Sequence, residues 1–223
     1  MLSTMTGGGM SDQPNDPLAS GSRSVNFFEN QFQRQVREQE FALNPFEILA
    51  IGYVAGEVLD LGCGLGNLTL EVAKRGCRVV AVDASPTALA RIRQVAEEES
   101  LPVETVLADL GTFRIAREFD TVVAIGLLMF FRRERALQLL SDIQGCVRPR
   151  GLAAVNVLVE GTTFLDMFDP DNYYLFGSEE LREHFAGWDI LVWRAETYPA
   201  PNGTVKKFTT VIAEKREPPT KGG

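Results

Sequence analysis

The chain has 223 residues, 45% of them hydrophobic, which is enough for one domain of ordinary size with a substantial core. Its net charge of −8 argues against broad nucleic-acid binding through phosphates, and no apolar run is long enough to span a bilayer. The chain does not begin with a basic segment followed by an apolar one, and its cysteines show no metal-ligand spacing. We therefore expect a cytoplasmic protein without a metal, nucleic-acid or membrane partner; no oligomeric state is predicted.

Both ends of the chain differ in composition from its middle. Residues 1–25 are rich in Gly, Ser, Asp and Pro without hydrophobic periodicity, which predicts a disordered extension. Residues 217–223 predict a disordered tail. One domain is expected over residues 26–216, in which residues 26–55 form an N-terminal helical lid or cap.

Strands and helices alternate in the middle of the chain. Near-continuous apolar runs predict strands of a parallel sheet that is buried on both faces, at residues 57–61, 78–83, 103–108, 121–125 and 152–159. Amphipathic segments between and after these runs predict helices at residues 67–75, 85–99, 132–146 and 178–185.

Two more strands are expected at residues 189–198 and 206–214. The connection between them is too short for a crossover, so these strands should pair antiparallel. The predicted fold class is therefore α/β, with a Rossmann-like, doubly wound, seven-stranded sheet that ends in a C-terminal antiparallel hairpin.

The first strand contains Asp60 and leads into a helix through a turn with Gly62, Gly64 and Gly66, and the second strand ends at Asp83. This is the layout of a nucleoside-cofactor site. A carboxylate directly before the glycines would repel a pyrophosphate. It suits a cationic ligand without phosphates, such as S-adenosylmethionine with its α-amino group and sulfonium.

Four motifs in chain order resemble those of the class I S-adenosylmethionine-dependent methyltransferases. They are the glycine turn after Asp60 and residues 79–83, 107–110 and 119–126. The resemblance implies S-adenosylmethionine as the cofactor, with its ribose bound by Asp83. The cofactor-binding residues that it implies are Asp60, Gly62, Gly64, Asp83, Ala84, Asp109, Leu110, Ala124 and Ile125.

Two other classes of protein are alternatives. A nicotinamide-dependent dehydrogenase also places an acid at Asp83, but Asp60, Asp109 and the C-terminal hairpin count against it. A protein that binds S-adenosylmethionine without catalysis is not excluded by the sequence.

The sequence offers few general bases. His184 is its only histidine, and its position beside Glu180 and Glu183 is typical of an exposed surface residue. Residues 126–131 lack the Asn-Pro-Pro-Tyr-like motif of many amine methyltransferases, and no acidic cluster has metal-ligand spacing. No catalytic residue is therefore assigned. A soft nucleophile, which needs no base, is favoured; O- or N-methylation of a small metabolite is the alternative.

A narrower resemblance concerns the second half of the chain. Residues 127–131 and 175–183, Gly187-Trp188 and the Asn202-Gly203 turn are similar to the tellurite-resistance methyltransferase family. This resemblance implies a small-molecule acceptor, either a soft chalcogen oxyanion or a thiol. The basic residues that the family carries just before the Asn-Gly turn are replaced here by residues 196–199.

The acceptor is expected beyond the carboxyl ends of the strands. Phe28 and Phe32 share a helical stripe that fits a packed helix or a lid, and Tyr173 and Tyr174 lie in a loop after the fifth strand. Lys206 and Lys207 follow the Asn-Gly turn and begin the last strand. Because neighbouring strand residues point to opposite faces, we expect at most one of these lysines to reach the pocket.

Overall fold

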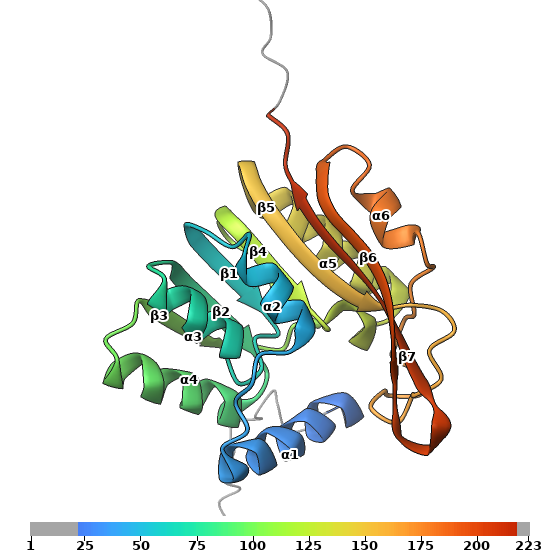
Figure 1. Cartoon of the computed structure of the whole chain (residues 1–223), viewed down its shortest axis with the longest axis horizontal. Helices are drawn as coiled ribbons and strands as arrows, with labels where there is room; N and C mark the ends of the chain where they lie inside the picture. Colours follow the sequence, from blue (N-terminus) through green and yellow to red (C-terminus); the bar gives the residue numbers. More distant parts are fainter. Residues whose placement is uncertain (1–21, 218–223) are drawn as a thin grey trace, which may run out of the picture.

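The computed structural model describes residues 22–217 (Figure 1). The first helix, α1, spans Arg23–Glu38 and so begins three residues before the expected domain boundary at residue 26. The rest of the predicted extension and nearly all of the predicted tail lie outside the described residues. Among the residues that are described, no helix is long and apolar enough to cross a membrane.

A seven-stranded sheet with the order β3-β2-β1-β4-β5-β7-β6 forms the centre of the molecule. Strands β1 to β5 are parallel, and β7 lies antiparallel between β5 and β6. The predicted fold class and hairpin are thus confirmed. The strands are β1 (Glu57–Leu61), β2 (Arg78–Asp83), β3 (Val103–Leu107), β4 (Phe119–Ile125), β5 (Val147–Leu158), β6 (Asp189–Pro199) and β7 (Val205–Glu214).

Helices cover both faces of the sheet. Buried residues of α2 and α3 pack against one face with Val58, Val123 and Ala154, whereas α5 and α6 pack against the other with Val122 and Val155. Val122 and Val123 are consecutive in β4 but pack on opposite faces, because successive side chains of a strand point to opposite sides of the sheet. The remaining elements are α2 (Pro45–Ile51), α3 (Asn67–Lys74), α4 (Pro86–Glu98), η1 (Leu128–Phe130), α5 (Arg133–Cys146), α6 (Glu180–His184) and η2 (Pro201–Gly203).

Strand β3 corrects one expectation. Residues 103–108 were predicted to be buried on both faces, but β3 is the edge of the sheet, and Leu107 is 47% exposed. An apolar run therefore indicates a strand without revealing whether it lies at the centre or at the edge.

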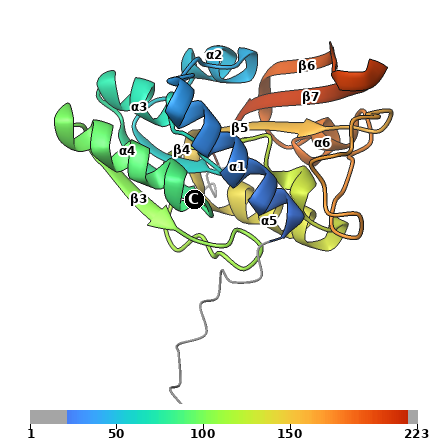
Figure 2. The same ribbon diagram turned by 90° about the horizontal axis from the view of Figure 1, so that it is seen from below.

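Helix α1 lies across the carboxyl ends of the parallel strands, where it crosses in front of the sheet in Figure 2. Glu29 of α1 accepts hydrogen bonds from the hydroxyls of Ser85 and Thr87 at the start of α4. At the N-terminal end of α1, the amide of Arg23 donates a hydrogen bond to Asp169 Oδ2, in the loop after β5, at 3.0 Å. These contacts hold α1 as a cover over the strand ends.

Candidate functional site

A cavity of about 880 Å³ lies at the carboxyl ends of β1, β2, β4 and β5, beneath α1. Its walls come from the glycine turn, from the connection after β4, and from α1, α2 and β7. The sequence-predicted residues that line it are Phe28, Phe32, Asp60, Gly62, Gly64, Asp83, Ala84, Asp109, Leu110, Ile125 and Lys206. The structure thus brings most of the predicted site together.

The turn between β1 and α3 has the left-handed backbone that its glycines allow. Gly62, Gly64 and Gly66 have φ values of 66°, 51° and 72°. A Cβ at Gly64 would lie 3.3 Å from Phe32 Cζ, and a Cβ at Gly66 would lie 2.4 Å from Ile92 Cγ1. The glycines therefore let α1 and α4 approach the turn closely.

Two carboxylates lie beside this turn. Asp83 Oδ2 accepts a hydrogen bond from the amide of Gly64 at 2.8 Å, and its Oδ1 accepts one from Ser85 at 2.8 Å. Asp60 is 4% exposed and accepts a hydrogen bond from Thr69 Oγ1 at 2.6 Å. Burial raises the pKa of Asp60 to about 7, and burial also raises the pKa of Asp83.

The charged residues that line the cavity are unbalanced. Glu47, Asp60, Asp83 and Asp109 are acidic, and Lys206 is the one basic residue among the described residues of the lining. The nearby charges of Glu47 and Asp83 add to the raised pKa of Asp60. A cationic ligand would relieve this repulsion, so these four carboxylates fit a ligand that carries a sulfonium and an amine.

The outer part of the cavity is aromatic. Phe28 of α1 packs edge-to-face on Phe130 with ring centroids 5.1 Å apart. Lys206 projects into the same space with its ammonium 4.5 Å from the centre of the Phe164 ring, and burial lowers the pKa of this lysine. Lys207 instead approaches Gly161 and does not line the cavity, which agrees with the expectation that at most one lysine reaches the pocket.

Four predicted residues lie elsewhere. Besides Lys207, Ala124 is fully buried in the core on the α5 face of the sheet, because neighbouring strand residues point to opposite faces. Tyr173 stacks on Phe168 with centroids 4.8 Å apart, and the Tyr174 hydroxyl donates to Glu180. Both tyrosines serve packing of the loop after β5, which corrects their assignment to the acceptor pocket.

Sequence reasoning missed many lining residues, and two of them, Asn156 and Glu47, carry polar groups that bear on the chemistry. Asn156 of β5 is fully buried; its Nδ2 donates to Thr210 Oγ1 at 2.9 Å, while its Oδ1 has no partner among the described residues. A lone amide inside an apolar strand was the available signal. Glu47 accepts a hydrogen bond from the amide of Asn44 at 2.7 Å in the capping box of α2, and burial raises its pKa. In the sequence Glu47 is explained by this helix cap alone, so its position at the cavity was not predicted.

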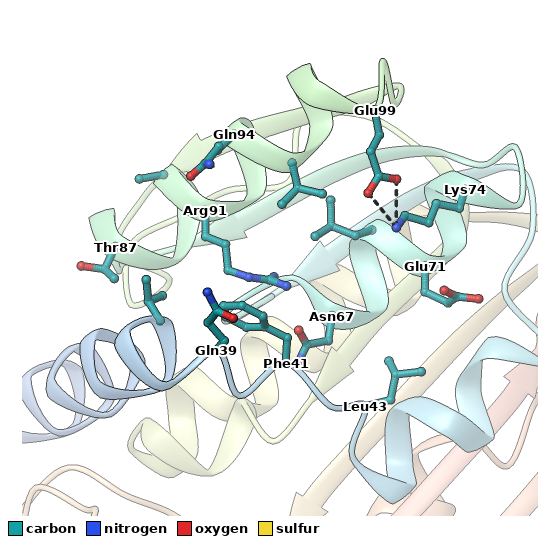
Figure 3. A pocket seen from close by; sticks show the side chains of 14 residues that line it. Gln39, Phe41, Leu43, Asn67, Glu71, Lys74, Thr87, Arg91, Gln94 and Glu99 are labelled. Atoms are coloured by element: carbon teal, nitrogen blue, oxygen red, sulfur yellow. Dashed lines mark hydrogen bonds and ion pairs between the residues drawn. The ribbon is translucent and has the colours of Figure 1, made fainter.

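A second hollow, of about 820 Å³, lies between α3, α4 and the chain that follows α1 (Figure 3). There the Arg91 guanidinium stacks on Phe41, 3.8 Å from the ring centre, and Lys74 pairs with Glu99 at 2.9 Å. The acidic residues of the sequence motifs, Asp60, Asp83 and Asp109, do not line this second hollow. The first cavity is therefore the candidate site.

Comparisons with known proteins agree with this geometry. Residues 58–151 match a family model described as a methyltransferase domain. The chain is 27% identical over 167 residues to the probable S-adenosyl-L-methionine-dependent methyltransferase TehB of Haemophilus influenzae, a match that covers 72% of this chain and 57% of the relative. It is 33% identical to a carboxy-S-adenosyl-L-methionine synthase of Erwinia tasmaniensis, over 65% of this chain and 60% of the relative. The chain thus spans little more than half of the length of these relatives.

Solved structures share the fold. The crystal structure of TehB from Haemophilus influenzae superposes with a TM-score of 0.69 at 23% identity, covering 85% of this chain and 67% of that one. A Burkholderia thailandensis N1-methyltransferase, crystallised with 1,6-didemethyltoxoflavin and S-adenosylhomocysteine, superposes with a TM-score of 0.61 at 23% identity, covering 87% of each chain.

Proposed function

Because this chain carries a methyltransferase domain on the class I methyltransferase fold, we propose that it methylates a small-molecule acceptor with S-adenosylmethionine, through a soft nucleophile such as a thiolate. The observation that carries the proposal is the acidic cavity at the strand ends. It offers four carboxylates to a cationic ligand beside a turn of three glycines.

The inner part of the cavity would hold the cofactor. We assign the ribose to Asp83, the adenine to Asp109 and Leu110, and the methionine portion to the turn around Gly62 and Gly64. Asp60, Ala84 and Ile125 complete this cofactor half. When bound, S-adenosylmethionine supplies a methyl group on positively charged sulfur; the acceptor's electron pair forms the new bond while the broken bond's pair stays on sulfur, which becomes neutral.

The chain's own residues orient the reactants and exclude water. Phe28 and Phe130 cover the cavity, and α1 is fixed at both sides by Glu29 and by the amide of Arg23. Enclosure of this kind favours the transfer because a desolvated anion is a stronger nucleophile than a hydrated one.

The lining favours a soft nucleophile. It contains no histidine or tyrosine among the described residues, and His184 lies exposed on α6. A thiol of moderate acidity loses its proton to solvent without help, so it needs no base in the cavity. The second candidate is transfer to oxygen or nitrogen with Glu47 as the base, because Glu47 lines the cavity and its pKa is raised.

Two measurements test the proposal. Calorimetry should detect binding of S-adenosylmethionine, and methyl-labelled cofactor should be consumed with thiols but not with catechols or primary amines. Tight binding of NAD in place of S-adenosylmethionine would contradict the cofactor assignment. Faster turnover of hydroxyl or amine acceptors, lost in Glu47→Gln, would favour the second candidate, and binding without any turnover would favour a non-catalytic role.

A further inference from the structure

The floor of the outer cavity changes character along the β5–β7 pair. Asn156 of β5 lies opposite Thr210 of β7, and Leu158 lies opposite Phe208. Lys206 lies two residues before Phe208 in the chain and points to the same face of β7, because side chains on a strand alternate between the two faces. Asn156, Leu158, Phe208 and Lys206 all line the cavity, so the floor runs from polar to apolar to cationic.

The polar end of this floor borders the cofactor half. Asn156 is in register with Ile125 at the end of β4, and the Gly126 amide donates to the Asn156 carbonyl at 3.0 Å. One atom of the side-chain amide bonds Thr210, and the other is buried without a partner among the described residues, in a residue that lines the cavity. Since the Thr210 hydroxyl can donate or accept, rotation of the amide lets Asn156 offer either NH₂ or C=O to a ligand.

The cationic end is distant from this amide. Thr210 and Lys206 are four residues apart, which corresponds to about 13 Å along a strand. The Lys206 ammonium is held over Phe164, whose amide donates to the Val205 carbonyl at 3.2 Å at the start of β7. No carboxylate within the described residues forms an ion pair with Lys206. The lysine is therefore available to an anion at the far end of the cavity.

We infer that the acceptor is an elongated organic anion, whose nucleophilic end lies at Asn156, whose apolar body lies on Leu158 and Phe208, and whose anionic group pairs with Lys206. This inference rests on the proposed function and specifies its substrate class. A bare chalcogen oxyanion has too few atoms to touch both ends of the floor. A thiol that carries a carboxylate on the order of 10 Å from its sulfur fits both.

The test uses mercaptoacetate, mercaptohexanoate and mercaptooctanoate, each with its uncharged methyl ester, and also selenite and tellurite. For the two long thiols, we expect the acid to exceed its ester in kcat/KM by about tenfold or more, as expected for a lost charged contact. The preference should be absent for mercaptoacetate. It should disappear in Lys206→Met and persist in Lys207→Met, the matched control whose side chain lies on the other face of β7.

A binding measurement decides the inference without turnover. The S-methyl product of each thiol is titrated into the S-adenosylhomocysteine complex, and the long acids should again bind about tenfold more tightly than their esters in the parent and in Lys207→Met only. Equal binding of acid and ester, or equal effects of the two lysine variants, would overturn the inference. So would faster turnover of selenite or tellurite than of every organic thiol.

The two hypotheses fail in different ways. If acids and esters are methylated equally, the proposed function stands and the inference about Lys206 is wrong. If the cofactor binds but no thiol, selenite or tellurite is methylated, the proposed function is wrong, while the product titration still tests the charge preference. Asn156→Leu should lower kcat for all thiols without changing the affinity for S-adenosylhomocysteine; unchanged kcat would remove Asn156 from the acceptor site.

Discussion

The two halves of the cavity are built in different ways. The cofactor half comes from the carboxyl ends of β1, β2 and β4 and from the turns that follow β1, β2 and β3, so each functional residue lies within a few positions of a strand end. The acceptor half is assembled from α1, α2, β5 and β7, from Phe28 to Lys206. The cofactor half therefore depends on local spacing and backbone conformation, whereas the acceptor half depends on long-range packing of side chains.

The largest effect is expected at the centre of the cofactor half. Asp83→Asn removes a half-buried charge that we assign to the ribose, and a hydrogen bond to a charged group contributes about 1.5–3 kcal/mol. We expect at least about a tenfold loss of S-adenosylmethionine affinity by calorimetry, with an unchanged circular dichroism spectrum. Asp109→Asn is the matched comparison, because its exposed carboxylate should contribute less. An unchanged affinity in Asp83→Asn would dismiss the cofactor assignment.

The second effect concerns stability. A Cβ at Gly66 would lie 2.4 Å from Ile92 Cγ1, and overpacking of this kind costs about 1–3 kcal/mol. Gly76 also has a positive φ, of 93°, but its Cβ would meet nothing within 4 Å. Gly66→Ala should therefore lower the free energy of unfolding, measured in urea, more than Gly76→Ala. Equal losses would mean that backbone strain alone governs both positions.

The difference between the two halves of the cavity also separates what the sequence could predict from what it could not. The spacing of Asp60, the glycines and Asp83 predicted the turn, the strands and their acids. The contact between Gly66 and Ile92 joins α3 to α4, and no local pattern records it. In the same way, the pairing of Asn156 with Thr210 follows from the register of β5 on β7, which the sequence does not specify. The tyrosines of the loop after β5 were misplaced because composition does not show which way a loop folds.

The pH dependence of cofactor binding tests the electrostatics of the cofactor half. Burial raises the pKa of Asp60 to about 7, and a cationic ligand binds better to the ionised carboxylate. Binding should therefore lower this pKa, so affinity should fall by up to about tenfold per pH unit below pH 7 and level off above it. Asp60→Asn should flatten the profile measured by calorimetry between pH 5.5 and 8 (a range set by the raised pKa). A parent profile without slope would show that Asp60 does not sense the ligand.

The same carboxyl affects stability with a fixed sign. Its pKa in the folded protein lies above its usual value of 3.8, so the folded state holds the proton more tightly. Its contribution to stability is therefore present below pH 3.8 and is lost as the pH rises through about 7. In the absence of ligand, the Tm of Asp60→Asn relative to the parent should accordingly increase between about pH 5 and pH 8, a range that contains the raised pKa of Asp60.

The smallest effect is expected at His184, outside both halves of the cavity. Its side chain is exposed on α6, and its backbone carbonyl accepts a hydrogen bond from Gln144 Nε2 at 2.7 Å, which alanine retains. If the nucleophile is a soft anion, His184→Ala should leave kcat within a few-fold of the parent at every pH. A loss of about 10²-fold or more would indicate general-base catalysis. The acceptor would then carry a protonated hydroxyl or amine, and the assignment of a soft nucleophile to the acceptor half would be wrong.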